Sequence, residues 1–145
     1  MSRKYDQRYE SITTPSRNFI ERYRADFFED ELDISLAVIH YRGGKEEFSL
    51  GKEYSGSVDS GDRQVGAQIL GQLGWSDQTF RLESIKILMT MLRDKDDQVI
   101  ASAAYALGHR SSHAAIDELV MLADHWSVDV RRGVVSGLSG LENQR

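Results

Sequence analysis

One motif returns three times along the chain at nearly constant spacing. Each copy combines an aspartate-bearing turn, a valine and a closing leucine; the valines are Val65, Val99 and Val130, and the leucines are Leu73, Leu107 and Leu138. The first step along the chain is 34 residues and the second is 31. A period of this size is typical of stacked helix pairs, because one such pair is too small to bury its own apolar face. We therefore expect an all-α, right-handed α-solenoid of about three helix pairs with an N-terminal helical cap.

The charge of the chain is acidic and evenly spread. It has 18 basic and 23 acidic side chains, and no block is basic enough to bind nucleic acid by neutralising phosphates. Cysteine is absent, which excludes disulfides and thiolate metal sites. No run approaches the roughly 18 apolar residues of a membrane span, and no apolar stretch of a secretory signal follows Met1. We expect a cytoplasmic protein that acts on neither membranes nor nucleic acid.

The apolar pattern divides the chain into a lead-in and one domain. Residues 1–18 are polar and are expected to be flexible, whereas residues 19–145 are expected to form the repeat domain. Between residues 19 and 39 the spacing fits either one bent helix or two short ones, and Gly43 and Gly44 end this stretch. First helices of the three pairs are expected near 46–54, 80–93 and 114–124, and second helices near 62–73, 97–108 and 129–141.

The repeated residues carry a family resemblance. Its elements are the turn aspartate Asp96, the following Val99, the closing Ala106-Leu107-Gly108, and Val130-Arg131 in the last repeat. Over roughly residues 34–141 the chain resembles the HEAT-repeat superfamily, in particular short-period HEAT-like repeats of phycobilin lyases and bacterial HEAT-repeat proteins of undefined role. The arginine that follows the valine in this family is replaced by Gly66 and Ile100. The resemblance therefore implies that the family's buried arginine–aspartate ladder is largely missing.

Small residues recur on the second helices, where close packing between layers requires them. Gly133 and Gly137 lie inside the last predicted helix, where each glycine costs about 1 kcal/mol relative to alanine. We expect this helix to be the least stable of the three and to lean on its neighbour.

A polar strip is predicted along the second helices, which usually line the concave side of a solenoid. At 100° per residue, Gln98, Ser102, Tyr105 and His109 share one face, and the repeat spacing extends it in both directions. The predicted partner-binding strip comprises Gln64, Gln68, Trp75, Gln98, Ser102, Tyr105, His109, Asp129 and Ser136. It could admit a helix or a loop of another protein; the alternative is ordinary solvated surface.

No catalytic constellation emerges from the sequence. His109 and His113 are four residues apart, but Gly108 and the residues after it place them in a turn, so no metal site is expected. The glycines near Lys52 lack the spacing of a phosphate-binding loop. The strip contains no lysine or arginine, which argues against the HEAT-like DNA glycosylases. No cofactor is expected.

These observations favour a non-catalytic interaction or scaffold module that binds another protein through its concave face. Two alternatives stay open. The small size and acidic charge also suit an immunity or inhibitor protein against a basic toxin. Trp75, Tyr105 and Trp126 permit a bilin lyase or chaperone-lyase. A homo-oligomer formed through an exposed C-terminal layer stays open as well.

Overall fold

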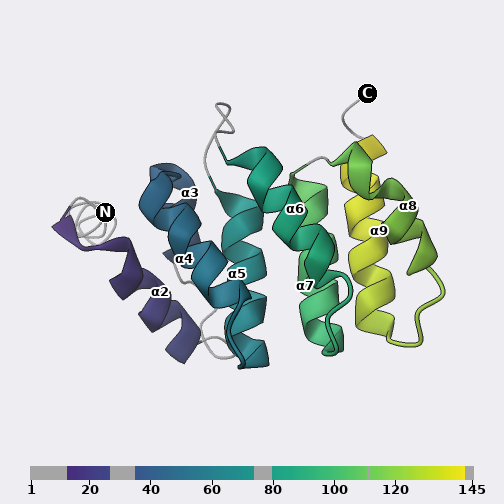
Figure 1. Cartoon of the computed structure of the whole chain (residues 1–145), viewed down its shortest axis with the longest axis horizontal. Helices are drawn as coiled ribbons and strands as arrows, with labels where there is room; N and C mark the ends of the chain where they lie inside the picture. Colours follow the sequence, from purple (N-terminus) through teal and green to yellow (C-terminus); the bar gives the residue numbers. More distant parts are fainter. Residues whose placement is uncertain (1–12, 27–34, 74–79, 111, 143–145) are drawn as a thin grey trace, which may run out of the picture.

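The computed structural model describes residues 13–26, 35–73, 80–110 and 112–142, and within these ranges the regular elements are helices. The short 3-10 helix η1 (His113–Ala115) runs directly into α8. The α-helices are α2 (Ser16–Ala25), α3 (Ser35–Arg42), α4 (Lys45–Ser55), α5 (Ser60–Gln72), α6 (Arg81–Met91), α7 (Asp97–His109), α8 (Ile116–Met121) and α9 (Val128–Glu142) (Figure 1).

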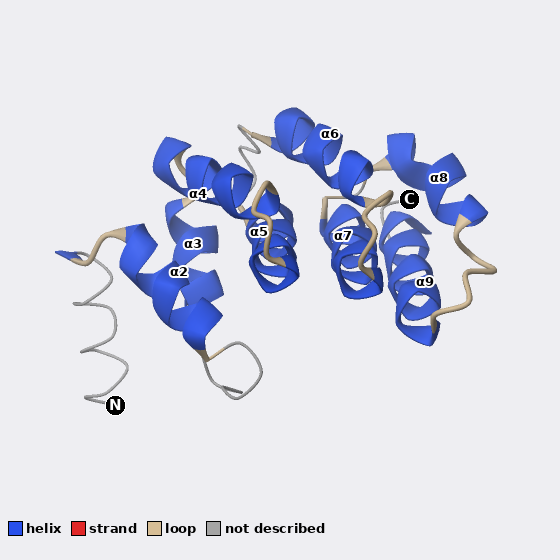
Figure 2. Cartoon of the chain, turned by 60° about the horizontal axis from the view of Figure 1, so that its bottom comes forward, coloured by secondary structure: helices blue, strands red, loops and turns tan. Residues whose placement is uncertain are grey.

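The helices form two layers. The first helices α4, α6 and α8 lie on one side, and the second helices α5, α7 and α9 lie side by side on the other (Figure 2). Helices α2 and α3 form the N-terminal end of the stack and pack against α4 and α5. The three predicted helix pairs are confirmed, and the architecture is a HEAT-like α-solenoid. None of the helices described combines the length and the apolar character needed to cross a bilayer.

The N-terminal boundary of the domain differs from the prediction. Helix α2 begins at Ser16, whose side chain is fully buried, so residues 16–18 do not belong to a flexible lead-in. The Ser16 hydroxyl donates to Glu47 Oε2 at 2.5 Å and accepts from Arg42 Nη1 at 2.8 Å. This network joins α2, α3 and α4. The polar composition of residues 1–18 suggested an exposed segment, but the Ser16 hydroxyl can be buried because its hydrogen bonds are made to other side chains. Residues 1–12 lie outside the described ranges.

The step between the first two repeats is 37 residues, not the predicted 34. A Cβ atom added to Gly71 would lie 2.7 Å from Ala106 Cβ, and one added to Gly108 would lie 2.8 Å from Gly137 Cα. The contacts are the same contact in successive repeats if Gly71 corresponds to Gly108, a step of 37 residues, and Ala106 corresponds to Gly137, a step of 31. The first residues of α5, α7 and α9 are separated by the same two steps. A three-residue error is nearly one helical turn, so it leaves apolar residues on almost the same face.

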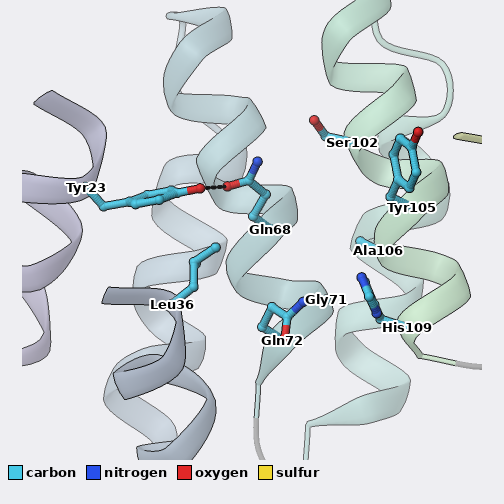
Figure 3. Close-up of a pocket in the computed structure, with 9 residues that line it drawn as sticks. All are labelled: Tyr23, Leu36, Gln68, Gly71, Gln72, Ser102, Tyr105, Ala106 and His109. Atoms are coloured by element: carbon cyan, nitrogen blue, oxygen red, sulfur yellow. Dashed lines mark hydrogen bonds between the residues drawn. The ribbon is translucent and has the colours of Figure 1, made fainter. Parts of the chain in front are cut away.

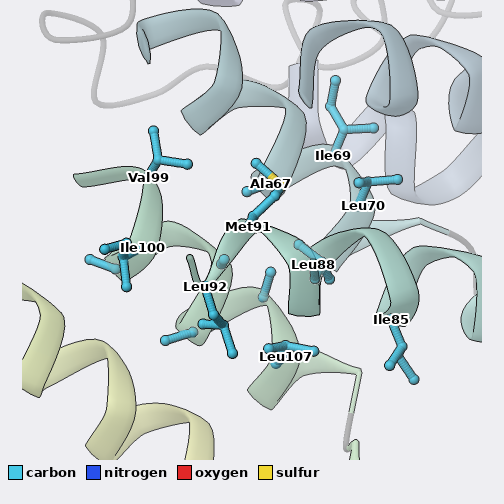
Figure 4. Close-up of a cluster of buried hydrophobic side chains, with 14 of the residues drawn as sticks. Ala67, Ile69, Leu70, Ile85, Leu88, Met91, Leu92, Val99, Ile100 and Leu107 are labelled. Carbon is cyan, nitrogen blue, oxygen red and sulfur yellow. The ribbon is translucent and has the colours of Figure 1, made fainter. Parts of the chain in front are cut away.

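The core lies between the two layers (Figure 4). With the corrected offset, the closing leucines of the first two repeats are Leu70 and Leu107, at most 1% exposed. Leu88 and Leu119 of the first helices are fully buried as well.

Helix α9 packs closely against α7, as expected from Gly133 and Gly137. Cβ atoms at Gly133 and Gly137 would each lie 2.8 Å from a backbone carbonyl oxygen of α7, that of Ala101 and that of Ala104 respectively. The two backbones therefore approach more closely than a side chain on α9 would allow.

Candidate interaction groove

A groove of about 280 Å³ opens along the second-helix layer (Figure 3). We call it the α5–α7 groove. Its lining residues come from α2, α3, α5 and α7, and they are Tyr23, Leu36, Gln68, Gly71, Gln72, Ser102, Tyr105, Ala106 and His109. Helix α5 turns Gly66 and Leu70 toward α4, so Gln68 and Gln72 point away from the first-helix layer.

The structure brings together four residues of the predicted strip, Gln68, Ser102, Tyr105 and His109. Gln64 is half-buried on the same helix but does not line the groove. Gln98 and Asp129 hydrogen-bond to each other at 2.7 Å outside the groove, and Ser136 is exposed on α9. Trp75 lies outside the described residues.

Sequence reasoning missed Gln72 because of the offset between the repeats. With a step of 37 residues, Gln68 is the counterpart of Tyr105 and Gln72 the counterpart of His109. All four side chains line the groove. The sequence signal that could have found this alignment is the pair of helix-capping aspartates, Asp59 and Asp96, which are separated by the correct step.

Hydrogen bonds orient the α5 wall of the groove. Tyr23 in α2 donates its hydroxyl proton to Gln68 Oε1 at 2.6 Å, which leaves the Gln68 NH₂ group without a partner in the described part of the chain. His40 Nδ1 lies 2.6 Å from the backbone oxygen of Gln72 and ties the end of α5 to α3. The side chain of Tyr105 on the opposite wall is 41% exposed.

Among the described residues, the groove lining contains no lysine, arginine, aspartate or glutamate. Across the ranges that the structure describes, no three histidine, aspartate or glutamate side chains gather closely enough to hold a metal ion. The arrangement therefore offers hydrogen-bonding groups and an aromatic surface to a partner.

An arginine ladder holds the helices that carry the groove. Arg63 Nη1 donates to the carbonyl oxygens of Ser57 and Val58, and Arg131 Nη1 makes the same two bonds to the carbonyls five and six residues before it. Arg63 also pairs with Asp94 at 2.9 Å. The prediction that the ladder is largely missing is therefore wrong for the first repeat, where Arg63, and not Gly66, is the counterpart of Arg131.

Polar contacts between successive helices continue on either side of the Arg63–Asp94 pair. Arg24 of α2 contacts Asp59 at 3.0 Å and Asp62 at 2.8 Å. Beyond it, the hydrogen bond from Gln98 to Asp129 links α7 to α9. Burial alone would raise the pKa of Asp94, but hydrogen bonds from Arg63 and from the Asp96 backbone lower it below its ordinary value.

Arg110 fixes the other end of the groove walls. It follows α7, is 7% exposed, and donates from Nε to the Leu70 carbonyl of α5 at 2.7 Å. Its Nη2 atom is buried and has no hydrogen-bond partner among the described residues, and Arg81 acts on it as a like charge. Burial, and secondarily Arg81, lower the pKa of Arg110 to about 10.

Comparisons with known proteins agree with the repeat fold. A family model described as HEAT repeats matches residues 53–139. Among solved structures, human deoxyhypusine hydroxylase in complex with glycerol is similar, with a TM-score of 0.60 and 20% sequence identity. The match covers 86% of this chain but only 43% of that enzyme, so it bears on the fold alone. No curated protein matches the sequence. The matched repeats span more than half of the chain, which therefore belongs to the HEAT-repeat family.

Proposed function

We propose that this chain is a non-catalytic interaction module that binds another protein through the α5–α7 groove. The observation that carries the proposal is the partly exposed Tyr105 in a groove whose described lining holds no lysine, arginine, aspartate or glutamate. Tyrosine is favoured at protein interfaces because it combines a large apolar ring with a hydrogen-bonding tip.

The arrangement of the aromatic residues favours this function over tetrapyrrole binding. Trp126 is 79% exposed and stacks on His125 in the loop before α9, and it is not part of the groove lining. Tyr105 shares the groove lining with one other aromatic side chain among the described residues, Tyr23, whose hydroxyl is bound to Gln68. A tetrapyrrole would be better served by several aromatic or apolar walls around one pocket.

The proposal is tested by affinity capture from native lysate with quantitative mass spectrometry. We expect at least one protein to be captured by the unchanged chain and lost with Tyr105→Ala. The control is Val135→Ala, which removes a side chain that is 64% exposed on α9 and distant from the groove lining. Equal capture by both variants, at equal melting temperatures, would contradict binding through the groove.

A further inference from the structure

We propose that Arg131, in the first turn of α9, is a carboxylate-binding site that receives an aspartate or glutamate side chain from a turn of another protein. Arg131 does not line the α5–α7 groove, so this site is separate from the one that carries the proposed function. The proposal follows from two arginines at equivalent positions of the repeats, of which one holds a carboxylate and the other does not.

Arg63 shows how such a site is built. Its Nη1 atom donates to two carbonyl oxygens of the loop before α5, which fixes the orientation of the guanidinium. The Nε and Nη2 atoms donate to the two carboxylate oxygens of Asp94 at 2.9 and 3.1 Å. The backbone N–H of Asp96 donates to the same carboxylate at 2.9 Å and orients it. An acidic residue in a turn is therefore the group that matches this edge of the arginine.

Arg131 has the same support but no carboxylate. Its Nη1 atom donates to the carbonyl oxygens of His125 at 2.6 Å and Trp126 at 3.0 Å, which precede it by six and five residues, as Ser57 and Val58 precede Arg63. The Nε and Nη2 atoms have no partner among the residues that the structure describes. Because the guanidinium is already oriented, a carboxylate that binds to it immobilises little further side-chain freedom.

The open edge of Arg131 faces away from α7. Arg63 holds Asp94 on the side of the following repeat, and α9 is the last of the three second helices in the stack (Figure 2). The equivalent edge of Arg131 therefore points beyond the stack.

The charge around this edge is positive. Two nearby carboxylates are engaged on the α7 side, because Asp129 accepts from Gln98 and Asp97 lies 3.8 Å from His125 Nε2. The neighbouring Arg132 is exposed and adds a second positive charge. A carboxylate is the complementary group for this part of the surface.

The carboxylate has to be carried by a larger partner. An ion pair to a half-exposed arginine contributes little free energy by itself, so a small free carboxylate would bind only weakly. Trp126 and Val128, in the loop before α9 and at its start, are 79% and 48% exposed and offer apolar surface to a protein.

Electrostatics also limit what that partner is. A second copy docked α9 against α9 would bring its own Arg131 and Arg132 against these two arginines, which repulsion between like charges disfavours. The net charge of −5 repels a strongly acidic protein as a whole. The partner that fits carries one carboxylate flanked by apolar residues.

The test is a selection of displayed, disulfide-closed random peptide loops on the full chain, followed by fluorescence anisotropy with the selected loops. We expect an aspartate or glutamate beside apolar residues in each loop. Arg131→Lys keeps the charge but loses the two-pronged geometry, and it should weaken binding roughly tenfold. Arg132→Lys is the matched control and should leave the affinity unchanged. Tyr105→Ala should also leave it unchanged, which separates this site from the groove.

Two further measurements use the unchanged chain and do not depend on how a variant folds. Replacing the acid of a selected loop by its amide should weaken binding roughly tenfold. In NMR spectra of the nitrogen-labelled chain, the Nε–H signal of Arg131 should shift when the loop is added. The Nε–H signal of Arg63 should stay in place because Asp94 already occupies that edge. Sodium acetate at the concentration of the loop should move neither signal.

Several results would overturn the proposal. Failure to enrich any loop, loops without an acid, or equal binding by Arg131→Lys at an equal melting temperature would each contradict a carboxylate site at Arg131. If Arg131→Lys melts at a lower temperature, the amide substitution and the Nε–H shift decide. Acetate that acts as well as the loop would show that a free carboxylate suffices. Self-association of the unchanged chain that Arg131→Lys abolishes would assign this edge to a second copy. Loss of loop binding in Tyr105→Ala would place the loops in the groove.

Discussion

Arg63 in α5 and Asp94 in the turn after α6 form a two-pronged ion pair across the boundary between two repeats. Nε donates to Oδ2 at 2.9 Å and Nη2 donates to Oδ1 at 3.1 Å, while Nη1 holds the loop before α5. Both side chains are only slightly exposed, at 11% and 12%. One guanidinium thus fixes the α4–α5 loop, the start of α5 and the next turn of the solenoid.

Removing one partner of this pair should be costly. Arg63→Leu leaves the Asp94 carboxylate poorly solvated and should lower the free energy of unfolding by about 3 kcal/mol in urea titrations. Arg17→Leu breaks an exposed pair with Glu53 and should cost less than about 1 kcal/mol. A smaller loss for Arg63→Leu than for Arg17→Leu would show that the pair does not hold the repeats together.

The same pair predicts how stability depends on pH. The folded-state pKa of Asp94 lies below its ordinary value of 3.8, so its contribution is complete above that value and is lost as the pH falls toward the lowered pKa. Asp94→Asn should therefore flatten the decline in unfolding free energy on acidification. Asp117→Asn, at an exposed position of α8, is the control and should leave the curve unchanged. Parallel curves for Asp94→Asn and the unchanged chain would refute the linkage.

Leu88 and Leu107 should be central to folding. Each leucine-to-alanine change leaves a cavity between the layers and should cost about 2–5 kcal/mol. Leu82 lies on α6 with Leu88 but is 66% exposed, so Leu82→Ala should change stability by less than about 0.5 kcal/mol. Chemical denaturation of the three variants compares them directly, and similar losses in all three would mean that the layers are not packed as described.

Gly137 gives a prediction opposite to helix propensity. An alanine at this position gains about 1 kcal/mol of propensity but places its Cβ 2.8 Å from the Ala104 carbonyl oxygen. Gly137→Ala should therefore lower the melting temperature, with a net loss of about 1–3 kcal/mol. At Gly56 the added Cβ would meet nothing closer than 3.7 Å, so Gly56→Ala should be neutral or mildly stabilising. If Gly137→Ala stabilised the chain, α7 and α9 would not be in close contact.

Arg110 should be replaceable although it is buried. Its pKa is lowered to about 10, so the charged form is penalised at every pH below that value. Arg110→Met keeps the apolar contacts, removes an unpaired guanidinium nitrogen, and should raise the unfolding free energy by about 1 kcal/mol. The gain should be the same at pH 6 and pH 8 by differential scanning calorimetry, because both lie below the lowered pKa. A loss would mean that the hydrogen bond to Leu70 outweighs the burial of the charge.

The helices were predicted correctly, and the alignment of the first two repeats was not. Apolar periodicity located all three pairs because a shift of three or four residues, about one helical turn, still leaves an apolar residue close to the buried face. Alignment of the repeats depends instead on contacts such as that between Gly71 and Ala106, which no single helix reveals. The helix caps Asp59 and Asp96 carry the correct offset of 37 residues, whereas Val65 and Val99 imply 34.

The wrong step between the first two repeats affected the predicted site residues on α5 but not those on α7. The residues on α7 were predicted directly from helical phase, and Ser102, Tyr105 and His109 line one groove in the structure. The residues on α5 were predicted by subtracting the 34-residue step from the α7 positions. This included Gln68, but it gave Gln64 and Trp75 and left out Gln72. Tyr23 and Leu36 come from the N-terminal helices, whose position over α5 depends on tertiary packing.

The outward side of α9 has a consequence for assembly. Small residues on α7, namely Ala101, Ala104 and Gly108, receive the glycines of α9. On α9 the corresponding positions, 31 residues later, are Arg132, Val135 and Ser139, all exposed. A helix approaching α9 as closely as α9 approaches α7 would have to desolvate a guanidinium and displace a branched side chain. A helix that packs on this side of α9 should therefore lie farther away or cross at another angle. The close contact seen between α7 and α9 would not be repeated on this surface of α9.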